Sequence, residues 1–259
     1  MRRVVMALAL ACFVLLPAAA AGRPVDETHP MTAGGSIGIE LVSGNLRVIG
    51  WDRAEMKITG TLGDEVEKLD VSGDGNAWHV EVVLVRGKHI RGGGTELEVR
   101  VPVESAVEVE TVSGGVSTEG TRGALDVEAV SGEVVVSGAL DTARISVVSG
   151  NVKFRSDRPV KSVQLRTVSG NVDASASLAK SARVEVEAFS GDVDFALPSD
   201  VSAEFRVSTF SGNIKNDFGG GEVKKSDHVP SRSLSFTTGS GDARVSVSSF
   251  SGSVRLVKR

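Results

Sequence analysis

The side chains that most often carry catalysis or hold metals are few and scattered in this sequence. Its four histidines are His29, His79, His89 and His228, and their spacing fits no metal-ligand pattern. The segment Gly239-Ser240-Gly241 lacks the G-x-S-x-G spacing of a nucleophilic serine. We therefore expect no catalytic residue, no metal site and no cofactor.

Amide and acidic side chains recur at one position, directly after a Ser-Gly pair. These residues are Asn151, Asn171, Asp192 and Asn213. Their oxygen atoms would suit calcium, but the nine-residue Gly-Gly-x-Gly-x-Asp repeat of calcium-binding β-helices is absent. Asn and Asp also tolerate the backbone conformations of tight turns, so a structural role at a corner explains them without a metal.

A second recurrent position, directly before the same Ser-Gly pairs, is always Val or Phe. The row consists of Val112, Val130, Val148, Val168, Phe189, Phe210 and Phe250. We favour the interpretation that these residues begin the next inner face, because large apolar side chains are mostly buried. If they face outward instead, they form an apolar stripe and a candidate partner-binding site. The two tryptophans, Trp51 and Trp78, are expected in the core rather than exposed for sugar binding.

Both positions belong to an internal repeat: an alternating strand, Val or Phe, Ser-Gly, and a second short strand. The serines of successive copies are Ser113, Ser131, Ser149, Ser169, Ser190 and Ser211, with separations of 18 to 21 residues. The next copy, at Ser251, follows after 40 residues, so the last coil contains an insertion at about 216–233. A period near 20 residues is typical of one turn of a β-solenoid.

Period-2 alternation predicts which side chains face inward. Val107 and Val109 share one parity, while Glu108 and Glu110 take the other, as in strands with one buried face. We expect one inner row to comprise Val109, Val127, Ile145, Val163, Val184, Phe205 and Val245. A second is expected to comprise Val116, Val134, Val152, Val172, Val193, Ile214 and Val254. The predicted fold class is all-β, a β-solenoid or β-helix-like stack of coils of ~20 residues.

Residues 35–103 contain strand-like segments with less regular spacing. Ser43-Gly44-Asn45 resembles a diverged first corner. We interpret this region as an N-terminal β-sheet cap, because the open end of a solenoid otherwise exposes unpaired strand edges. The predicted organisation is a signal peptide at 1–21, a linker at 22–34, the cap at 35–103 and solenoid repeats at 104–259.

The first residues predict export. Arg2 and Arg3 precede an apolar run at 4–16 that is too short to span a bilayer, and alanines follow at 18–21. The only cysteine, Cys12, lies in this segment, where the preceding residues disfavour a lipoprotein signal. Without Arg2 and Arg3, 27 basic residues face 33 acidic ones, which disfavours a nucleic-acid partner. We expect a periplasmic, outer-surface or secreted protein with no transmembrane span.

Several segments resemble one known family. Gly50-Trp51-Asp52-Arg53 after a short strand, Val101-Pro102 and the serial V-S-G-x-V coils are similar to the candidate-adhesin family of bacterial β-strand-repeat proteins, a domain of unknown function. Gly239-Ser240-Gly241 leading into Phe250-Ser251-Gly252 is similar to that family's final coil. The resemblance covers about residues 35–256. It implies a β-repeat fold and placement in the cell envelope or outside the cell, and it supplies no catalytic residues.

We therefore expect a non-catalytic, exported binding scaffold that resembles an adhesin, a monomer whose partner is an unknown protein or glycan of the cell envelope. One alternative is an accessory role in envelope-stress signalling. Another is a polysaccharide-cleaving β-helix enzyme, which requires charged residues clustered on one face. The outward charges of this sequence are spread along the chain instead: Glu108, Glu128, Arg144, Arg166, Glu185 and Arg206.

Overall fold

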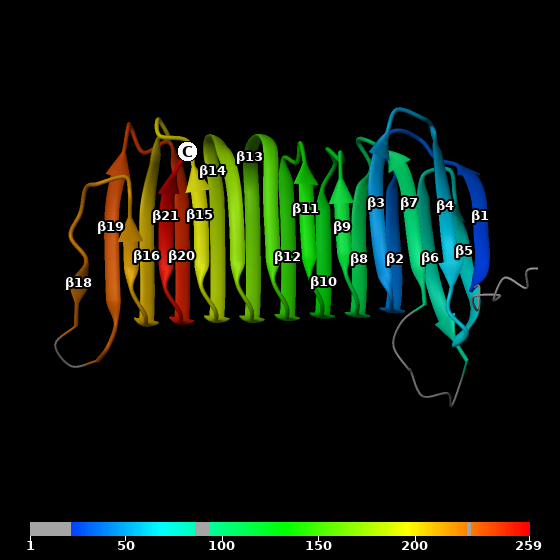
Figure 1. Ribbon diagram of the computed structural model, residues 1–259. Coiled ribbons are helices and arrows are strands. Elements are labelled where there is room, and N and C mark those ends of the chain that lie inside the picture. Colours follow the sequence, from blue (N-terminus) through cyan, green and yellow to red (C-terminus); the bar gives the residue numbers. More distant parts are fainter. Residues whose placement is uncertain (1–21, 86–93, 227–228) are drawn as a thin grey trace, which may run out of the picture.

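The computed structural model describes residues 22–85, 94–226 and 229–259, and these residues form strands and no helix. Figure 1 shows a long, flattened stack of strands with the blue N-terminal strands at one end and the orange β18 and β19 at the other. The predicted signal peptide, Cys12, His89 and His228 lie outside the described residues. In the described part of the chain, no helix is long and apolar enough to span a membrane.

Each repeat folds into a coil whose strands meet at the Ser-Gly corner. The regular coils are β2 (Ser36–Ser43) with β3 (Asn45–Trp51), β8 (Ala106–Ser113) with β9 (Val116–Glu119), and β10 (Leu125–Ser131) with β11 (Val134–Gly138). Next come β12 (Thr142–Ser149), β13 (Val152–Ser169), β14 (Val172–Ser190) and β15 (Val193–Leu197), where β13 and β14 each continue from one sheet into the other. The last coils are β16 (Ala203–Ser211) with β17 (Ile214–Asn216), and β20 (Ala243–Ser251) with β21 (Val254–Lys258).

These strands form two layers, each with parallel strand pairing. The strands before the corners form sheet I, and the strands after the corners form sheet II. In sheet I, Val127 pairs with Val109 on one side and Ile145 on the other. In sheet II, Val134 pairs with Val116 and Val152. The inward side chains of both sheets are buried and form the core, which confirms the predicted β-solenoid.

One of the two predicted inner rows is misaligned in its second half. Ile145 pairs with Leu165, whereas Val163 pairs with Ala143. The coils align at their corners, where Ser149 pairs with Ser169. A row must therefore be counted back from the corner serine, because the loop between coils varies in length.

The corner glycines are required by the close approach of neighbouring coils. A Cβ atom on Gly132, whose φ is +135°, would lie 1.9 Å from the carbonyl oxygen of Gly114. On Gly170, a Cβ atom would lie 2.0 Å from the carbonyl oxygen of Gly150. The positive φ and the packed carbonyl both exclude a side chain, so glycine recurs at this position.

At several corners, the Asn or Asp after the glycine links its coil to the next. Asn151 Oδ1 accepts a hydrogen bond of 2.9 Å from the backbone N–H of Asn171, and Asn171 Oδ1 accepts one of 2.9 Å from that of Asp192. Asp192 Oδ1 accepts the N–H of Ser253 at 2.7 Å. These bonds satisfy corner amides and account for the recurrence of Asn and Asp.

The coils do not stack in the order of the sequence at the C-terminal end. β20 pairs with β14 on one side and β16 on the other, and β21 pairs with both β15 and β17. The insertion supplies β19 (Arg232–Thr238), antiparallel to β16, and β18 (Lys224–Lys225), antiparallel to β19. The last coil therefore lies inside the stack, red in Figure 1, and the insertion covers the end.

The N-terminal end is also covered by antiparallel strands. β6 (Ala77–Leu84) and β7 (Glu96–Pro102) extend sheets I and II beyond β2 and β3. β5 (Val66–Asp74) is antiparallel to β6, and β4 (Glu55–Leu62) is antiparallel to β7. β1 (Arg23–Pro30) pairs with β4, so the expected linker at 22–34 contains a strand. β2 and β3, expected in the cap, are a coil of the stack, because Ser43 pairs with the corner serine Ser113.

Candidate functional site

The Val and Phe residues before the corners face solvent, so the expectation that they are buried is wrong. Their side chains are 38% to 57% exposed. The alternation of the strand explains this: Thr111 faces inward and is buried, so the next residue, Val112, faces outward. We call Val42 and these residues the apolar row; in stack order they are Val42, Val112, Val130, Val148, Val168, Phe189, Phe250 and Phe210. Val42 is half-buried.

The three phenylalanines form a stack of parallel rings. The ring of Phe250 lies 4.9 Å from that of Phe189 and 4.8 Å from that of Phe210, with interplanar angles of 3° in both pairs. These distances repeat the ~4.8 Å spacing of neighbouring strands. The Phe250 ring therefore has a parallel ring beside each of its two faces, in an offset stack.

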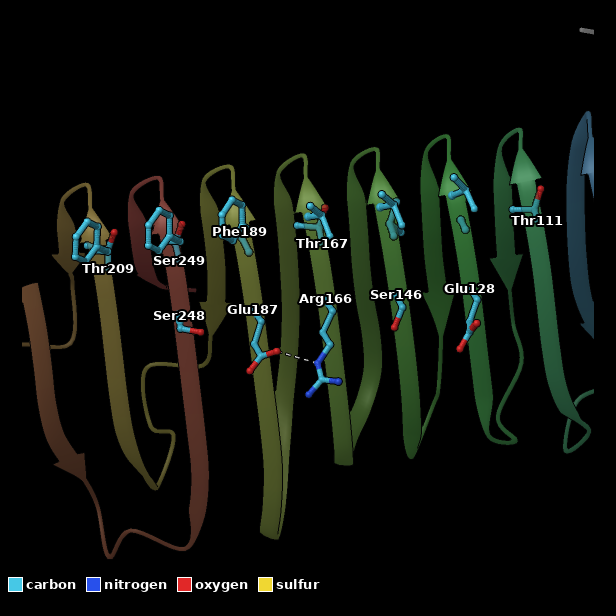
Figure 2. Close-up of a pocket in the computed structure, with 18 of the residues that line it drawn as sticks. Thr111, Glu128, Ser146, Arg166, Thr167, Glu187, Phe189, Thr209, Ser248 and Ser249 are labelled. Carbon is cyan, nitrogen blue, oxygen red and sulfur yellow. Dashed lines mark ion pairs between the residues drawn. The ribbon is translucent and has the colours of Figure 1, made fainter. Parts of the chain in front are cut away.

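A groove of about 1010 Å³ follows the apolar row across the strands. Its other wall is the outward residue two positions earlier on each strand. In stack order these are Glu40, Glu110, Glu128, Ser146, Arg166, Glu187, Ser248 and Ser208. Figure 2 shows Phe189 next to the corner, with Glu187 further from the corner and Arg166, Ser146 and Glu128 on successive strands. The groove reaches Arg232 on the cap strand β19.

The wall of the groove is acidic at one end. Glu110 and Glu128 form no ion pair within the described part of the chain, and neither does Glu108 beside them. Asp126, next to Glu128, lies 3.7 Å from Arg144. Burial raises the pKa of Asp126 and the carboxylates of Glu128 and Glu108 add to the rise, whereas Arg144 opposes it. Negative charge is therefore concentrated on β8 and β10.

The other half of the groove is close to neutral. Arg166 lies 2.9 Å from Glu187, and because both line the groove their charges cancel in its wall; Glu185, 3.8 Å from Arg166, does not line the groove. Beside Phe250 and Phe210, the wall consists of Ser248 and Ser208. The groove thus changes from acidic to neutral along the stack.

The outer face of sheet II carries no comparable surface in the residues that the structure describes. Several of its charges are paired: Arg47 lies 2.9 Å from Glu119, and Arg255 lies 3.4 Å from Asp194. Elsewhere in the described residues, the large apolar side chains that are exposed are Val223 and Val229 of the insertion. The exposed apolar surface of the stack is therefore concentrated on sheet I.

The tryptophans are half-buried rather than buried in the core as expected. Trp51 Nε1 donates a hydrogen bond of 2.8 Å to the carbonyl oxygen of Glu55, and the guanidinium of Arg53 lies 5.0 Å from its ring centre. Trp78 Nε1 donates to the carbonyl oxygen of Pro30 at 3.1 Å. These contacts give both indoles a structural role at the N-terminal end.

The remaining candidate residues that the structure describes do not form a reactive centre. His79 lies 3.6 Å from Glu40, and His29 lies 3.2 Å from Glu27. In the described ranges, no group of three or more His, Cys, Asp or Glu residues is placed to hold a metal ion. The apolar row and its groove are thus the most developed surface feature of the described chain.

The sequence matches the Toastrack DUF4097 family over residues 29–257, and the chain belongs to this family. This match confirms the resemblance to a candidate-adhesin domain of unknown function. No curated protein matches the chain.

The solved structures that are similar to the chain include three proteins from different bacteria. One is a candidate cell adhesion protein from Clostridium sporogenes, with 10% identity, a TM-score of 0.42 and coverage of 92% of this chain and 100% of that one. Another is a candidate adhesin from Bacteroides fragilis, with 13% identity, a TM-score of 0.46 and coverage of 91% and 97%. A third is a candidate lipid-binding protein from Parabacteroides distasonis, with 13% identity, a TM-score of 0.35 and coverage of 92% and 98%.

Proposed function

We propose that this protein is a non-catalytic, exported binding scaffold of the cell envelope, and that the apolar row is where it docks a partner protein. One observation carries the proposal: half-exposed Val and Phe side chains continue from strand to strand along one face of the stack. Contiguous exposed apolar surface marks interaction sites in soluble proteins. Completing the burial of one half-exposed Val or Phe would stabilise a complex by about 1 kcal/mol.

The fold alone does not require apolar residues at these positions. Other outward positions of the same strands carry charged or small polar residues, such as Glu110, Arg166 and Ser248. Corner geometry is set by the Ser-Gly pair and by the residue after it, not by the residue before. A binding role explains why Val or Phe recurs on the solvent side.

The ring geometry favours a protein over a glycan as the partner. Carbohydrate binding by aromatic side chains uses the face of the ring, which the partner's sugar must reach. Phe189 and Phe210 lie beside the two faces of Phe250, so a sugar would have to share these faces with the neighbouring rings. Apolar protein side chains can pack against the exposed parts of these rings and against the neighbouring valines.

The carboxylates of sheet I support binding rather than glycoside cleavage. A glycosidase needs an acid and a second carboxylate on opposite sides of a bound sugar. The groove is lined by Glu110 and Glu128 but not by Asp126, the carboxyl group whose pKa is raised by burial. The carboxyl group best suited to act as the acid, that of Asp126, therefore does not line the groove.

The test is capture of envelope proteins by the tagged protein and by two double variants. We expect Val148→Ser with Phe250→Ser to lose a specific partner that the wild type captures. The matched control is Val135→Ser with Glu119→Gln on the outer face of sheet II, which should retain it. The partner is then identified by mass spectrometry and bound again as a pure protein. Equal capture by the row variant, with its β-sheet circular dichroism unchanged, would reject the proposal.

A further inference from the structure

We infer that the segment of the partner that binds the apolar row is a cationic amphipathic α-helix of about 22 residues. This inference rests on the proposed docking function and names the kind of segment that the row fits. It is argued from the direction of the row, its spacing and the charge of its flank.

The direction of the row excludes an added β-strand. A strand binds by pairing with a free sheet edge. The apolar row crosses the strands instead, and each of them already has a hydrogen-bonded neighbour on both sides; β8, for example, lies between β2 and β10. A helix satisfies its own backbone hydrogen bonds and presents only side chains, so it can lie across the strands.

The spacing of the row matches an apolar helical stripe. Neighbouring members lie one strand apart, ~4.8 Å. The apolar positions of an amphipathic helix advance by ~5.3 Å for each 3.5 residues. From Val42 to Phe210 the row spans about 34 Å, over which the two spacings drift apart by only ~3 Å. A helix of about 22 residues has this length and can place its apolar side chains between successive members of the row.

The charge of the groove wall predicts which residues flank the apolar stripe of the bound helix. Glu110 and Glu128 line the groove beside Val112 and Val130 without an ion pair in the described part of the chain. On the same strands, Glu108 and Asp126 extend this negative surface away from the groove; the other half of the wall is neutral. Lys or Arg is therefore expected beside the apolar stripe over β8 and β10, and uncharged residues over β20 and β16.

A second copy of this chain fits the row poorly. If two copies meet row to row with opposite stack directions, β10 with Asp126 and Glu128 opposes β14 with Glu185 and Glu187. If the stacks run in the same direction, the acidic strands β8 and β10 oppose themselves. Unpaired carboxylates face one another in the second arrangement, and in the first the charges of β14 are already paired with Arg166. Neither arrangement therefore places an unpaired cation opposite Glu110 and Glu128. The same carboxylates would repel an anionic membrane surface.

Synthetic peptides test the inference directly. The probes are peptides of about 22 residues with a leucine stripe of helical period and lysines flanking the stripe in one half. Two versions place the lysines in the N-terminal or the C-terminal half, so that both helix directions are sampled. One control replaces lysine with glutamate; the other keeps the composition but alternates apolar and polar residues. Fluorescence anisotropy at about 0.05 M and 0.5 M salt measures the dissociation constants.

We expect one lysine version to bind at least about ten-fold more tightly than either control, and to weaken at high salt. Glu110→Gln with Glu128→Gln should weaken its binding by about ten-fold, whereas Glu119→Gln on sheet II should not. Val130→Ser with Val148→Ser should abolish binding, and Val135→Ser should preserve it. Equal binding of the lysine and glutamate peptides, or of the alternating peptide, would overturn the inference.

The outcomes separate the two proposals. If no peptide binds but the row variants still lose the envelope partner, the docking function stands and the helix inference is wrong. If the row variants retain the partner, the docking function itself is wrong. Sedimentation that shows a dimer in the wild type and a monomer in Val130→Ser with Val148→Ser would identify a second copy as the occupant and would also overturn the inference.

Discussion

The corner glycines are predicted to control the stability of the whole stack, and Gly132→Ala tests this. The added Cβ atom would lie 1.9 Å from the carbonyl oxygen of Gly114, whereas a carbon–oxygen contact needs about 3.3 Å. The two coils must therefore separate locally by about 1.4 Å. This displacement weakens the corner hydrogen bonds from Gly114 N–H to the carbonyl oxygen of Ser131 and from Val116 N–H to that of Glu133, both 3.0 Å.

The expected cost follows from these contacts. Alanine at the φ of +135° of Gly132 carries a backbone penalty of about 1–3 kcal/mol, and each weakened hydrogen bond adds about 1 kcal/mol. We therefore expect a loss of about 3–5 kcal/mol in the free energy of unfolding. Gly34→Ala is the matched control: its φ is +80° and no atom lies within 4 Å of the added Cβ. It should cost about 1 kcal/mol.

The assay is urea denaturation of both variants, followed by far-ultraviolet circular dichroism. Because repeat proteins can unfold in parts, hydrogen exchange of the amides near the corner accompanies it. In Gly132→Ala, the amides of Gly114 and Val116 should exchange faster than those of the N-terminal cap. If Gly132→Ala and Gly34→Ala lose the same stability, the close approach of the corners is not what requires glycine.

Three further predictions concern polar groups. Asn171→Ala should cost about 1 kcal/mol and speed hydrogen exchange at the amide of Asp192, which loses its acceptor; unchanged exchange there would count against the polar ladder. Burial raises the pKa of Asp126, so the folded state holds the proton of this carboxyl group more tightly than the unfolded state does. The free energy of unfolding therefore falls as pH rises above the usual pKa of an aspartate. Asp126→Asn should therefore be more stable than the wild type at neutral pH, but not at a pH below the usual pKa of an aspartate. A urea midpoint below that of the wild type at neutral pH would contradict this. The hydrogen bond from Lys161 lowers the pKa of Asp141, so that its contribution is present above the usual pKa and disappears as pH falls through the lowered one. Asp141→Asn should be destabilising at neutral pH only, and the same comparison of midpoints checks it.

Local sequence patterns were sufficient to predict the coils. The Ser-Gly corner and the alternation before it involve residues close in sequence, so the repeat reveals the turn, the inner face and the stacking of Val127 on Val109. The same alternation indicates that Val112 faces outward, because Thr111 faces inward. The expectation of burial gave the apolar character of Val112 more weight than its parity, and the parity was correct.

The order of the last coils could not be predicted in this way. Phe250 lies between Phe189 and Phe210 because β20 pairs with both β14 and β16. That choice depends on pairings between distant segments and on the path of the insertion. The aromatic end of the apolar row is therefore a product of tertiary pairing, although each phenylalanine is recognisable in its own repeat.

The most direct test of the central claim is site-specific photo-cross-linking in the native envelope. A benzophenone amino acid is placed at position 168, in the apolar row, or at position 135, on the outer face of sheet II. We predict cross-links to a specific partner protein from position 168 and none from position 135. The absence of a cross-link from position 168, or equal cross-linking from both positions, would contradict the assignment of the apolar row as the docking surface.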